Sequence, residues 1–298
     1  MSQILPDVTI VIPAYNEEAG IGAVLHSLTT LVATQHLVYE IIVVNDGSTD
    51  GTGQVLAGFD TITVIDHQYN RGYGAALKTG IRAAHSDIIV ITDADGTYPN
   101  ERIPELVDLM QDRDMVVGAR TTANAKIPLI RRPPKWVLSK LANYLAETRI
   151  DDINSGLRAF RKAIIVRFFN ILPNGFSFTM TITLAMHTNN YQVLYVPIDY
   201  FVRVGHSKIR PIQDTIRFLN TVIRTVFYFN PMRVLTPIGV FFVLLSAIVG
   251  IGSFLAGQLL DVTTLILFVT GVQVFLTGAV ADLIDKRNRI DNVDEQLL

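Results

Sequence analysis

The sequence predicts an α/β protein in which a mostly parallel sheet domain precedes a pair of long apolar helices. In residues 8–118, short runs of branched apolar residues alternate with stretches of helical periodicity, a pattern typical of βαβ units. Charged residues make up only 17% of the 298 residues, and the mean hydropathy is +0.35. Most of the excess apolar character lies in the last quarter of the chain, which indicates a membrane part.

Five strands are predicted, at residues 8–12, 40–45, 62–65, 88–91 and 115–118. The fourth is apolar on both faces, as buried parallel strands are. Helices are predicted between the strands, because apolar side chains recur at helical spacing up to about residue 31, after Gly72, and over residues 103–110. Right-handed crossovers gather the carboxyl ends of such strands at one edge of the sheet, where open α/β sheets bind their ligands.

Polar residues follow several of these strands. Asp46 follows the second strand, Asn70 the third, and Asp93 and Asp95 the fourth. Two carboxylates spaced i, i+2 before Gly96 suit Mg²⁺ or Mn²⁺ shared with substrate phosphates, although they could instead cap the next helix. The edge therefore suits a nucleotide diphosphate, with Asp46 accepting hydrogen bonds from the base or the ribose.

The sequence disfavours several other classes of protein. No G-x-G-x-x-G motif follows the first strand and no P-loop motif occurs, which argues against dinucleotide oxidoreductases and P-loop enzymes. The net charge of −2 gives no support for nucleic-acid binding, and the absence of cysteine excludes disulfides, thiolate metal sites and a cysteine nucleophile. The N-terminus lacks a basic region, so no signal peptide is expected.

The second half of the chain predicts membrane contact. Residues 131–148 combine basic residues with Trp136 on an apolar face, which indicates a helix in the membrane interface or an amphipathic helix packed on the domain. Residues 234–260 and 262–281 carry no charge, and each is long enough for the roughly 20 residues that span a bilayer. They predict a transmembrane hairpin, the alternative being a buried core hairpin. Positive charges flank the hairpin and are missing from its loop, which predicts cytoplasmic ends.

The predicted protein is a multi-pass protein of the cell membrane with both termini in the cytoplasm. Its segments are a catalytic domain at residues 1–210 with an interfacial helix at 130–148, a juxtamembrane amphipathic helix at 211–232, two transmembrane helices at 233–285, and a cytoplasmic tail at 286–298.

Several segments resemble the successive motifs of family 2 glycosyltransferases, which have the GT-A fold: residues 12–18, 45–50, 70–72 and 93–96. Residues 152–158 and 203–208 resemble the branch that contains dolichol-phosphate mannose synthases and bacterial polyprenyl-phosphate sugar transferases. The resemblance covers about residues 8–208. It implies a membrane-bound inverting transferase that moves a sugar from a UDP- or GDP-sugar to polyprenyl or dolichyl phosphate.

The resemblance also implies roles for matching residues. Asp95 would be the principal metal ligand, and Asp93 would lie near the sugar and the metal. With these two, Asp152 is predicted as a catalytic residue, a candidate for positioning groups or relaying a proton. The nucleotide-sugar pocket would contain Pro13, Tyr15, Glu17, Asp46, Asp93, Ala94 and Asp95. The lipid phosphate would be bound by Arg120, Arg203, Ser207 and Lys208. On the charge requirement of the phosphate, Arg131 is predicted as a further binding residue. The chain departs from common patterns at Thr97, where relatives often have a Gln ligand, and at His206, where many have Lys.

A phosphate acceptor has a chemical rationale. A phosphate monoester has a second pKa of roughly 6, so at pH 7 it is mostly dianionic and needs cationic partners more than a general base. Two alternatives stay open: transfer to a hydroxyl of a glycolipid or polysaccharide, and a catalytically silent scaffold that binds nucleotide sugar. Processive synthases usually carry a Gln-x-x-Arg-Trp motif, which is absent because the single tryptophan is Trp136. Self-association into a homo-oligomer is also left open.

Overall fold

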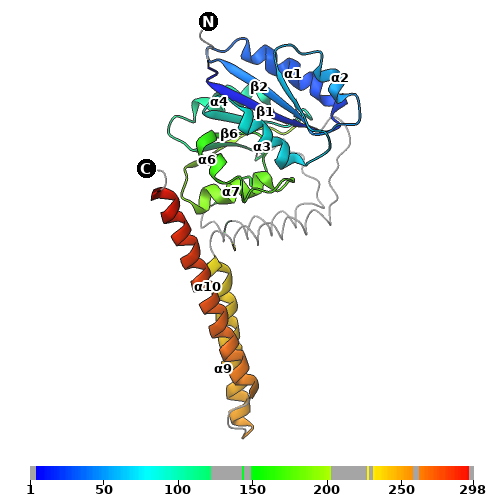
Figure 1. The fold of residues 1–298 in the computed structure, drawn as a ribbon. Helices are drawn as coiled ribbons and strands as arrows, with labels where there is room; N and C mark the ends of the chain where they lie inside the picture. Colours follow the sequence, from blue (N-terminus) through cyan, green and yellow to red (C-terminus); the bar gives the residue numbers. More distant parts are fainter. Residues whose placement is uncertain are drawn as a thin grey trace. The chain divides into compact units, whose positions relative to one another are not determined.

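The computed structural model describes residues 5–121, 143, 149–202, 227, 231–257 and 262–294 (Figure 1). The chain divides into two compact units, Met1–Thr221 and Val222–Leu298, and each is described by itself. Apart from residues 143, 227, 231 and 232, the predicted helices at 130–148 and 211–232 lie outside the described residues.

A seven-stranded sheet forms the centre of the first unit. Its strands are β1 (Val8–Ala14), β2 (Tyr39–Asn45), β3 (Thr63–Asp66), β4 (Ile88–Ile91), β5 (Met115–Ala119), β6 (Arg158–Arg161) and β7 (Val193–Pro197). The strand order is β3-β2-β1-β4-β6-β5-β7, and only β6 runs antiparallel to its neighbours. The predicted mostly parallel sheet is confirmed, and all five predicted strands are present.

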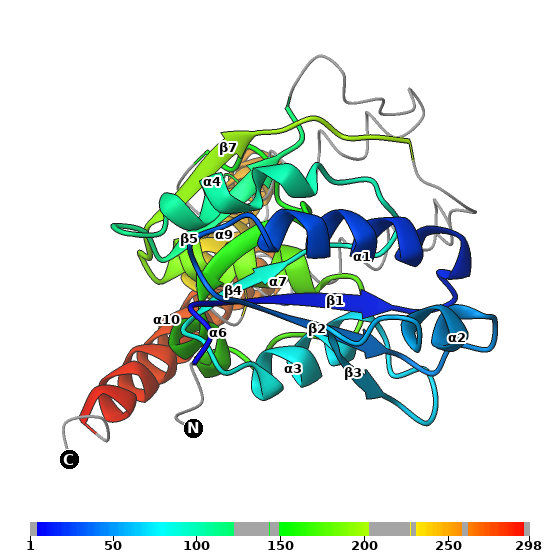
Figure 2. The same cartoon turned by 90° about the horizontal axis from the view of Figure 1, so that it is seen from above.

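Helices cover both faces of the sheet. They are α1 (Glu18–Val32), α2 (Thr52–Leu56), α3 (Tyr73–Ala83), the 3₁₀ turn η1 (Asn100–Arg102), α4 (Ile103–Asp108), α6 (Lys162–Arg167) and α7 (Phe178–Thr188). Figure 2 shows α1 and α4 on one side of the sheet and α3 on the other. Every residue of β1 is buried, as a central strand covered on both faces requires. A Cβ at Gly80 would lie 2.4 Å from Val11 Cγ1, so glycine allows α3 to approach β1 closely.

The strands β6 and β7 were not expected from the sequence. The β6 segment combines two arginines with Ala159 and Phe160, which gives no apolar run. In the sheet, Ala159 pairs with Val90 of β4 on one side and Val116 of β5 on the other. The fourth and fifth predicted strands, β4 and β5, are therefore separated in the sheet by β6, which begins about 40 residues after the end of β5.

Two long apolar helices form the second unit, α9 (Pro231–Leu255) and α10 (Val262–Asp294). The stretches Pro231–Leu255 and Val262–Ile284 have mean hydropathies of 2.5 and 2.0, and each is long enough to cross a membrane. The helices pack closely at Gly239 and Gly271, where a Cβ on either residue would lie 2.9–3.0 Å from the other's carbonyl oxygen. The helix α10 continues into the predicted tail, as far as Asp294.

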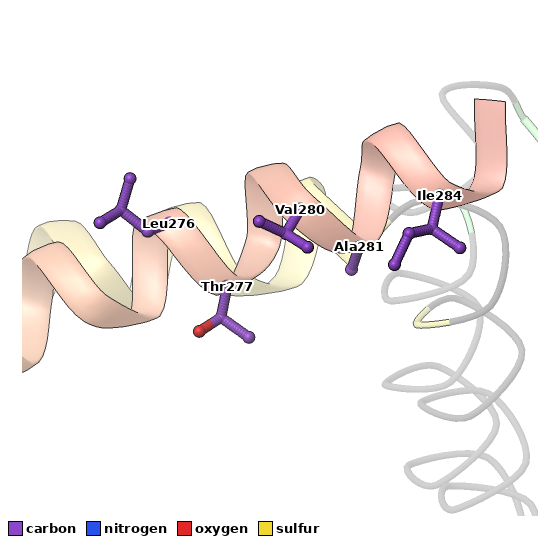
Figure 3. A pocket seen from close by; sticks show the side chains of 5 residues that line it. All are labelled: Leu276, Thr277, Val280, Ala281 and Ile284. Carbon is purple, nitrogen blue, oxygen red and sulfur yellow. The ribbon is translucent and has the colours of Figure 1, made fainter. Parts of the chain in front are cut away.

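A shallow hollow of about 390 Å³ lies along α10 (Figure 3). Its lining is apolar except for the hydroxyl of Thr277, which donates to Gln273 O of the same helix at 2.8 Å. The lining residues are Leu276, Thr277, Val280, Ala281 and Ile284. The lining of this hollow offers no charged group to a polar ligand.

An ion-pair cluster at the amino end of β2 predicts a pH dependence of stability. Glu40 accepts hydrogen bonds from the backbone and ring of His85 and from the hydroxyl of Thr9, at 2.8–3.1 Å. Burial alone raises the pKa of Glu40, but these hydrogen bonds outweigh it and hold the pKa below its ordinary value of 4.5. The charged form thus stabilises the fold above pH 4.5, and this stabilisation is lost as the pH falls through the lower folded-state pKa.

We therefore expect the difference in melting temperature between the wild-type protein and Glu40→Gln to be largest above pH 4.5 and to shrink as the pH falls below that value. Thermal unfolding followed by circular dichroism measures it. Glu101→Gln, at an exposed position of η1, serves as the control. A difference that does not change with pH would contradict the assignment.

Candidate functional site

The candidate site lies at the carboxyl edge of the sheet, where three neighbouring strands end together. The strands β2, β1 and β4 are adjacent and parallel. The residues that follow them, namely Asp46, Tyr15 and Asp93, are therefore brought to one edge. The predicted gathering of polar strand ends is present in the fold.

The loops after β1 and β2 are bonded to each other. Asn16 has a left-handed backbone (φ 52°), and its side-chain oxygen accepts from the Thr49 N–H at 2.8 Å. In return, the N–H of Asn16 donates to Ser48 Oγ at 3.0 Å, and that of Glu17 donates to Thr52 Oγ1 at 2.9 Å. These bonds satisfy loop N–H groups that no strand partner reaches, and they join the two sequence motifs into one wall of the edge.

Asp46 organises the turn that leads into α3. Its carboxylate lies 2.6 Å from His67 Nδ1 and accepts from the N–H groups of Arg71 and Gly72 at 2.9 and 2.8 Å. The ring of His67 reaches Thr79 through its other nitrogen at 3.0 Å. Asp46 is 2% exposed, and protein donors engage both of its oxygens. Its contact with a base or ribose stays a prediction, whereas its bonds to the turn are part of the fold.

The two carboxylates after β4 are each held by a hydroxyl group. Asp93 Oδ1 accepts from the Tyr73 hydroxyl at 2.9 Å. Asp95 Oδ1 accepts from the backbone N–H and the hydroxyl of Thr97 at 3.1 and 2.7 Å. Thr97 is fully buried, so in this chain its hydroxyl supports Asp95 from within the turn. Gly20 of α1 packs against this turn, because a Cβ there would meet Ala94 O at 3.0 Å.

Arg120 and Asp152, predicted for separate roles, form a bidentate ion pair. Arg120 donates from Nε and Nη2 to the two Asp152 oxygens at 2.7 and 2.9 Å, and its backbone N–H adds a third bond at 3.0 Å. The side chains are 19% and 2% exposed. Burial alone lowers the pKa of Arg120, but the surrounding Tyr98 and Asp152 raise it well above its ordinary value. The guanidinium is therefore permanently charged, and Asp152 is held as its counter-ion.

Aromatic residues connect this ion pair to the Asp93 turn. The guanidinium of Arg120 stacks over Tyr200 at 5.1 Å, and Tyr200 contacts Tyr98 edge-on at 5.4 Å. The Tyr98 oxygen accepts from the Gly156 N–H at 2.6 Å. A Cβ at Gly156 would lie 2.7 Å from Asp93 Oδ2, so glycine lets the backbone lie directly against that carboxylate.

Arg158 is a fully buried arginine beside the site. It donates to the backbone oxygens of Ser155 and Thr179 and to Thr183 Oγ1, the last at 2.9 Å. Burial lowers the pKa of Arg158, yet its guanidinium stays charged, because arginine is not deprotonated in proteins. These bonds tie β6 to α7 and fix the backbone before Gly156.

The structure locates most of the predicted site residues, although it does not test their roles. Pro13, Ala94, Asp46, Asp95 and Asp152 are buried, whereas Tyr15, Glu17, Asp93 and Arg120 are partly exposed. Four predicted phosphate-binding residues lie outside the described part of the chain: Arg131, Arg203, Ser207 and Lys208. Tyr73, Tyr98 and Arg158 were given no role from the sequence. Tyr73 directly follows the motif at residues 70–72, which is the one signal that pointed to it.

The donor set at Asp93 and Asp95 fits a hard divalent ion that is shared with a ligand. Carboxylate oxygens suit Mg²⁺ and Mn²⁺, which usually take one or two protein carboxylates plus substrate phosphates. Among the described residues, no group of three His, Cys, Asp or Glu side chains could hold a metal ion. Within the described part of the chain, the two carboxylates would thus be a partial ligand set of the kind that substrate phosphates complete.

A mostly parallel sheet with a two-carboxylate turn at its carboxyl edge is the architecture of GT-A glycosyltransferases, as the sequence motifs predicted. The family model for glycosyl transferase family 2 matches residues 9–169, and the model for the GtrB C-terminal hairpin matches residues 230–286. The chain belongs to glycosyltransferase family 2, and the predicted enzyme class is confirmed.

Relatives named for lipid-phosphate sugar transfer match this chain. The dolichyl-phosphate hexose transferase of Haloferax volcanii is 31% identical over 207 residues, which is 69% of this chain and 87% of that protein. The undecaprenyl-phosphate 4-deoxy-4-formamido-L-arabinose transferase of Serratia proteamaculans is 28% identical over 284 residues, which is 90% of this chain and 80% of that protein.

A solved structure shares the fold. Glucosyl-3-phosphoglycerate synthase from Mycobacterium tuberculosis, in complex with Mn²⁺, UDP and phosphoglyceric acid, matches with a TM-score of 0.59 and 23% identity. The match covers 74% of this chain and 78% of that one. At this identity the likeness concerns the fold.

Proposed function

We propose that the protein transfers a sugar from a UDP- or GDP-sugar to polyprenyl or dolichyl phosphate at a membrane surface. The observation that carries this proposal is the Asp93–Asp95 turn beside the β1 and β2 loops, in a chain whose relatives are named for transfer to such lipid phosphates. We assign the oxygen ligands of this turn to the donor side, and Arg120, which is paired with Asp152, to the acceptor phosphate.

The donor occupies the edge formed by the first, second and fourth strands. Pro13, Tyr15, Glu17, Asp46 and Ala94 line the nucleotide, and Asp93 and Asp95 face its diphosphate. Asp95 would be the principal ligand of a bound Mg²⁺ or Mn²⁺, which would supply positive charge to the leaving nucleoside diphosphate. Thr97 acts on Asp95 through its hydroxyl.

The acceptor phosphate is held by cations. Arg120, Arg131, Arg203 and Lys208 bind the dianion, and Ser207 adds a hydroxyl. A phosphate oxygen bonds to the anomeric carbon while the bond from that carbon to the diphosphate oxygen breaks, with inversion. Because the nucleophile is already ionised, Asp152 serves by holding Arg120 in place, and no general base is required.

The membrane part delivers the acceptor. The helices α9 and α10 cross the bilayer as a hairpin, and the catalytic domain of residues 1–210 and both termini lie in the cytoplasm. The segments predicted to be interfacial, 130–148 and 211–232, would contact the membrane surface, and the tail begins at residue 286.

A donor and acceptor panel tests the proposal. Purified protein in detergent receives polyprenyl phosphate, Mg²⁺ or Mn²⁺, and one labelled donor: UDP-glucose, UDP-N-acetylglucosamine, UDP-galactose, GDP-mannose, or nucleotide-activated 4-deoxy-4-formamido-L-arabinose. We expect label in the lipid extract with one donor, dependence on the metal, and no product when polyprenol replaces polyprenyl phosphate.

Transfer to polyprenol or to a glycolipid hydroxyl would instead assign a hydroxyl acceptor. Absence of transfer from every donor, with binding of nucleotide sugar retained, would favour the scaffold alternative and overturn the proposal.

A further inference from the structure

Tyr73 contacts one of the two carboxylates of the proposed metal site. Its hydroxyl donates to Asp93 Oδ1 at 2.9 Å. A phenol donates its O–H, whereas an ionised carboxylate can only accept, so the hydroxyl of Tyr73 is the donor in this bond. The bond therefore holds one oxygen of Asp93.

The Tyr73 ring is itself held in place. Tyr73 is the first residue of α3 and directly follows Gly72, whose N–H is bonded to Asp46 and whose backbone is left-handed (φ 98°). Its ring stacks on Phe176 at 5.5 Å with an interplanar angle of 21°. The loop that carries Phe176 is anchored to α3, because Lys78 donates to Leu172 O at 2.5 Å.

Asp93 is confined from a second direction. The Gly156 backbone lies so close that a Cβ would be 2.7 Å from Oδ2 and 2.9 Å from Oδ1 of Asp93. Arg158 and Tyr98 hold this backbone through Ser155 O and the Gly156 N–H. A carboxylate held between a hydroxyl donor and a close backbone has little freedom to rotate, which is what a pre-organised metal ligand requires.

We propose that Tyr73 is a positioning residue for Asp93 and acts through that carboxylate on the affinity for a divalent ion. The inference rests on the proposed function only in that it takes Asp93 and Asp95 as the metal ligands. Partners that orient a metal ligand typically contribute about 10–100-fold to metal affinity or activity.

The test is a titration of Mn²⁺, followed by electron paramagnetic resonance, in the presence of UDP or GDP. Wild-type protein is compared with Tyr73→Phe, which removes the hydroxyl and keeps the ring that stacks on Phe176. Tyr195→Phe is the matched control, because Tyr195 bonds His187 at 2.9 Å and has no contact with the Asp93 turn among the described interactions. A second variant, Gly156→Ala, displaces Asp93 from its other side.

We expect the dissociation constant of Mn²⁺ to rise about 10-fold or more in Tyr73→Phe and in Gly156→Ala, and to stay within about twofold in Tyr195→Phe. Where turnover is measured, we expect kcat to fall in Tyr73→Phe while KM for the lipid phosphate is unchanged. Melting temperatures of the two tyrosine variants should fall by similar amounts.

Unchanged Mn²⁺ affinity in Tyr73→Phe overturns the inference, and so does an equal loss in Tyr195→Phe or a wild-type protein that binds no Mn²⁺. Weakened Mn²⁺ binding in Tyr73→Phe, in a protein that transfers no sugar to any lipid phosphate, supports the inference while the proposed function fails.

Discussion

Asp95→Asn is expected to lower sugar transfer by about 10²–10³-fold. The substitution keeps the size of the side chain and removes its negative charge, which we assign to binding the metal ion that neutralises the leaving diphosphate. Losing one electrostatic partner of this kind commonly lowers kcat by about this factor. The amide oxygen of the substituted side chain could still accept the Thr97 hydroxyl bond, so the turn should keep its shape. Initial rates with the donor found in the panel, at saturating metal, measure the effect.

Asp112→Asn is the matched control, since Asp112 is exposed on the turn before β5. Near-normal turnover in Asp95→Asn would remove Asp95 from the metal site. A loss of activity that is fully explained by a lower melting temperature would indicate a structural role instead.

Breaking the Arg120–Asp152 pair is expected to reduce both stability and activity. Asp152→Ala leaves a largely buried guanidinium without its counter-ion, and removing one partner of such a pair typically costs about 3–5 kcal/mol of unfolding free energy. Arg120→Ala exposes Asp152 to the same penalty. Chemical denaturation of the full chain in detergent, followed by circular dichroism, measures the change.

The double variant Arg120→Met/Asp152→Leu separates the two roles. Apolar residues of similar volume often replace a buried ion pair without loss of stability, so we expect the double variant to be more stable than either single variant. It should stay below the wild type, because Leu at position 152 no longer accepts from the N–H groups of Arg120 and Asn154. Transfer should stay absent, because the cation that faces the acceptor phosphate is gone. Recovery of transfer in the double variant would show that the pair is structural alone.

Asp152 illustrates how the tertiary structure changed a sequence-based interpretation. The motif at residues 152–158 suggested positioning or proton relay. In the fold, both carboxylate oxygens accept from Arg120, and the Asn154 N–H adds a further bond at 3.2 Å. A carboxylate held by so many donors is a poor base, so the positioning role is the one we retain in the proposal.

Elements with local signals could be predicted from the amino-acid sequence. Apolar patterns indicated the five predicted strands, the helices between them and the C-terminal hairpin. Burial of a face of a helix or strand requires apolar residues at regular positions along it, so the pattern can be read from the sequence. The Asp93–Asp95 turn was also predicted, since two carboxylates after a buried strand are recognisable without any partner.

Contacts between distant groups became visible only in the folded chain. The insertion of β6 between β4 and β5, the pairing of Arg120 with Asp152 across 32 residues, and the hydroxyl of Tyr73 on Asp93 across 20 residues leave no periodic trace. Such contacts depend on strand order and register, which are set by the packing of the whole sheet and its helices.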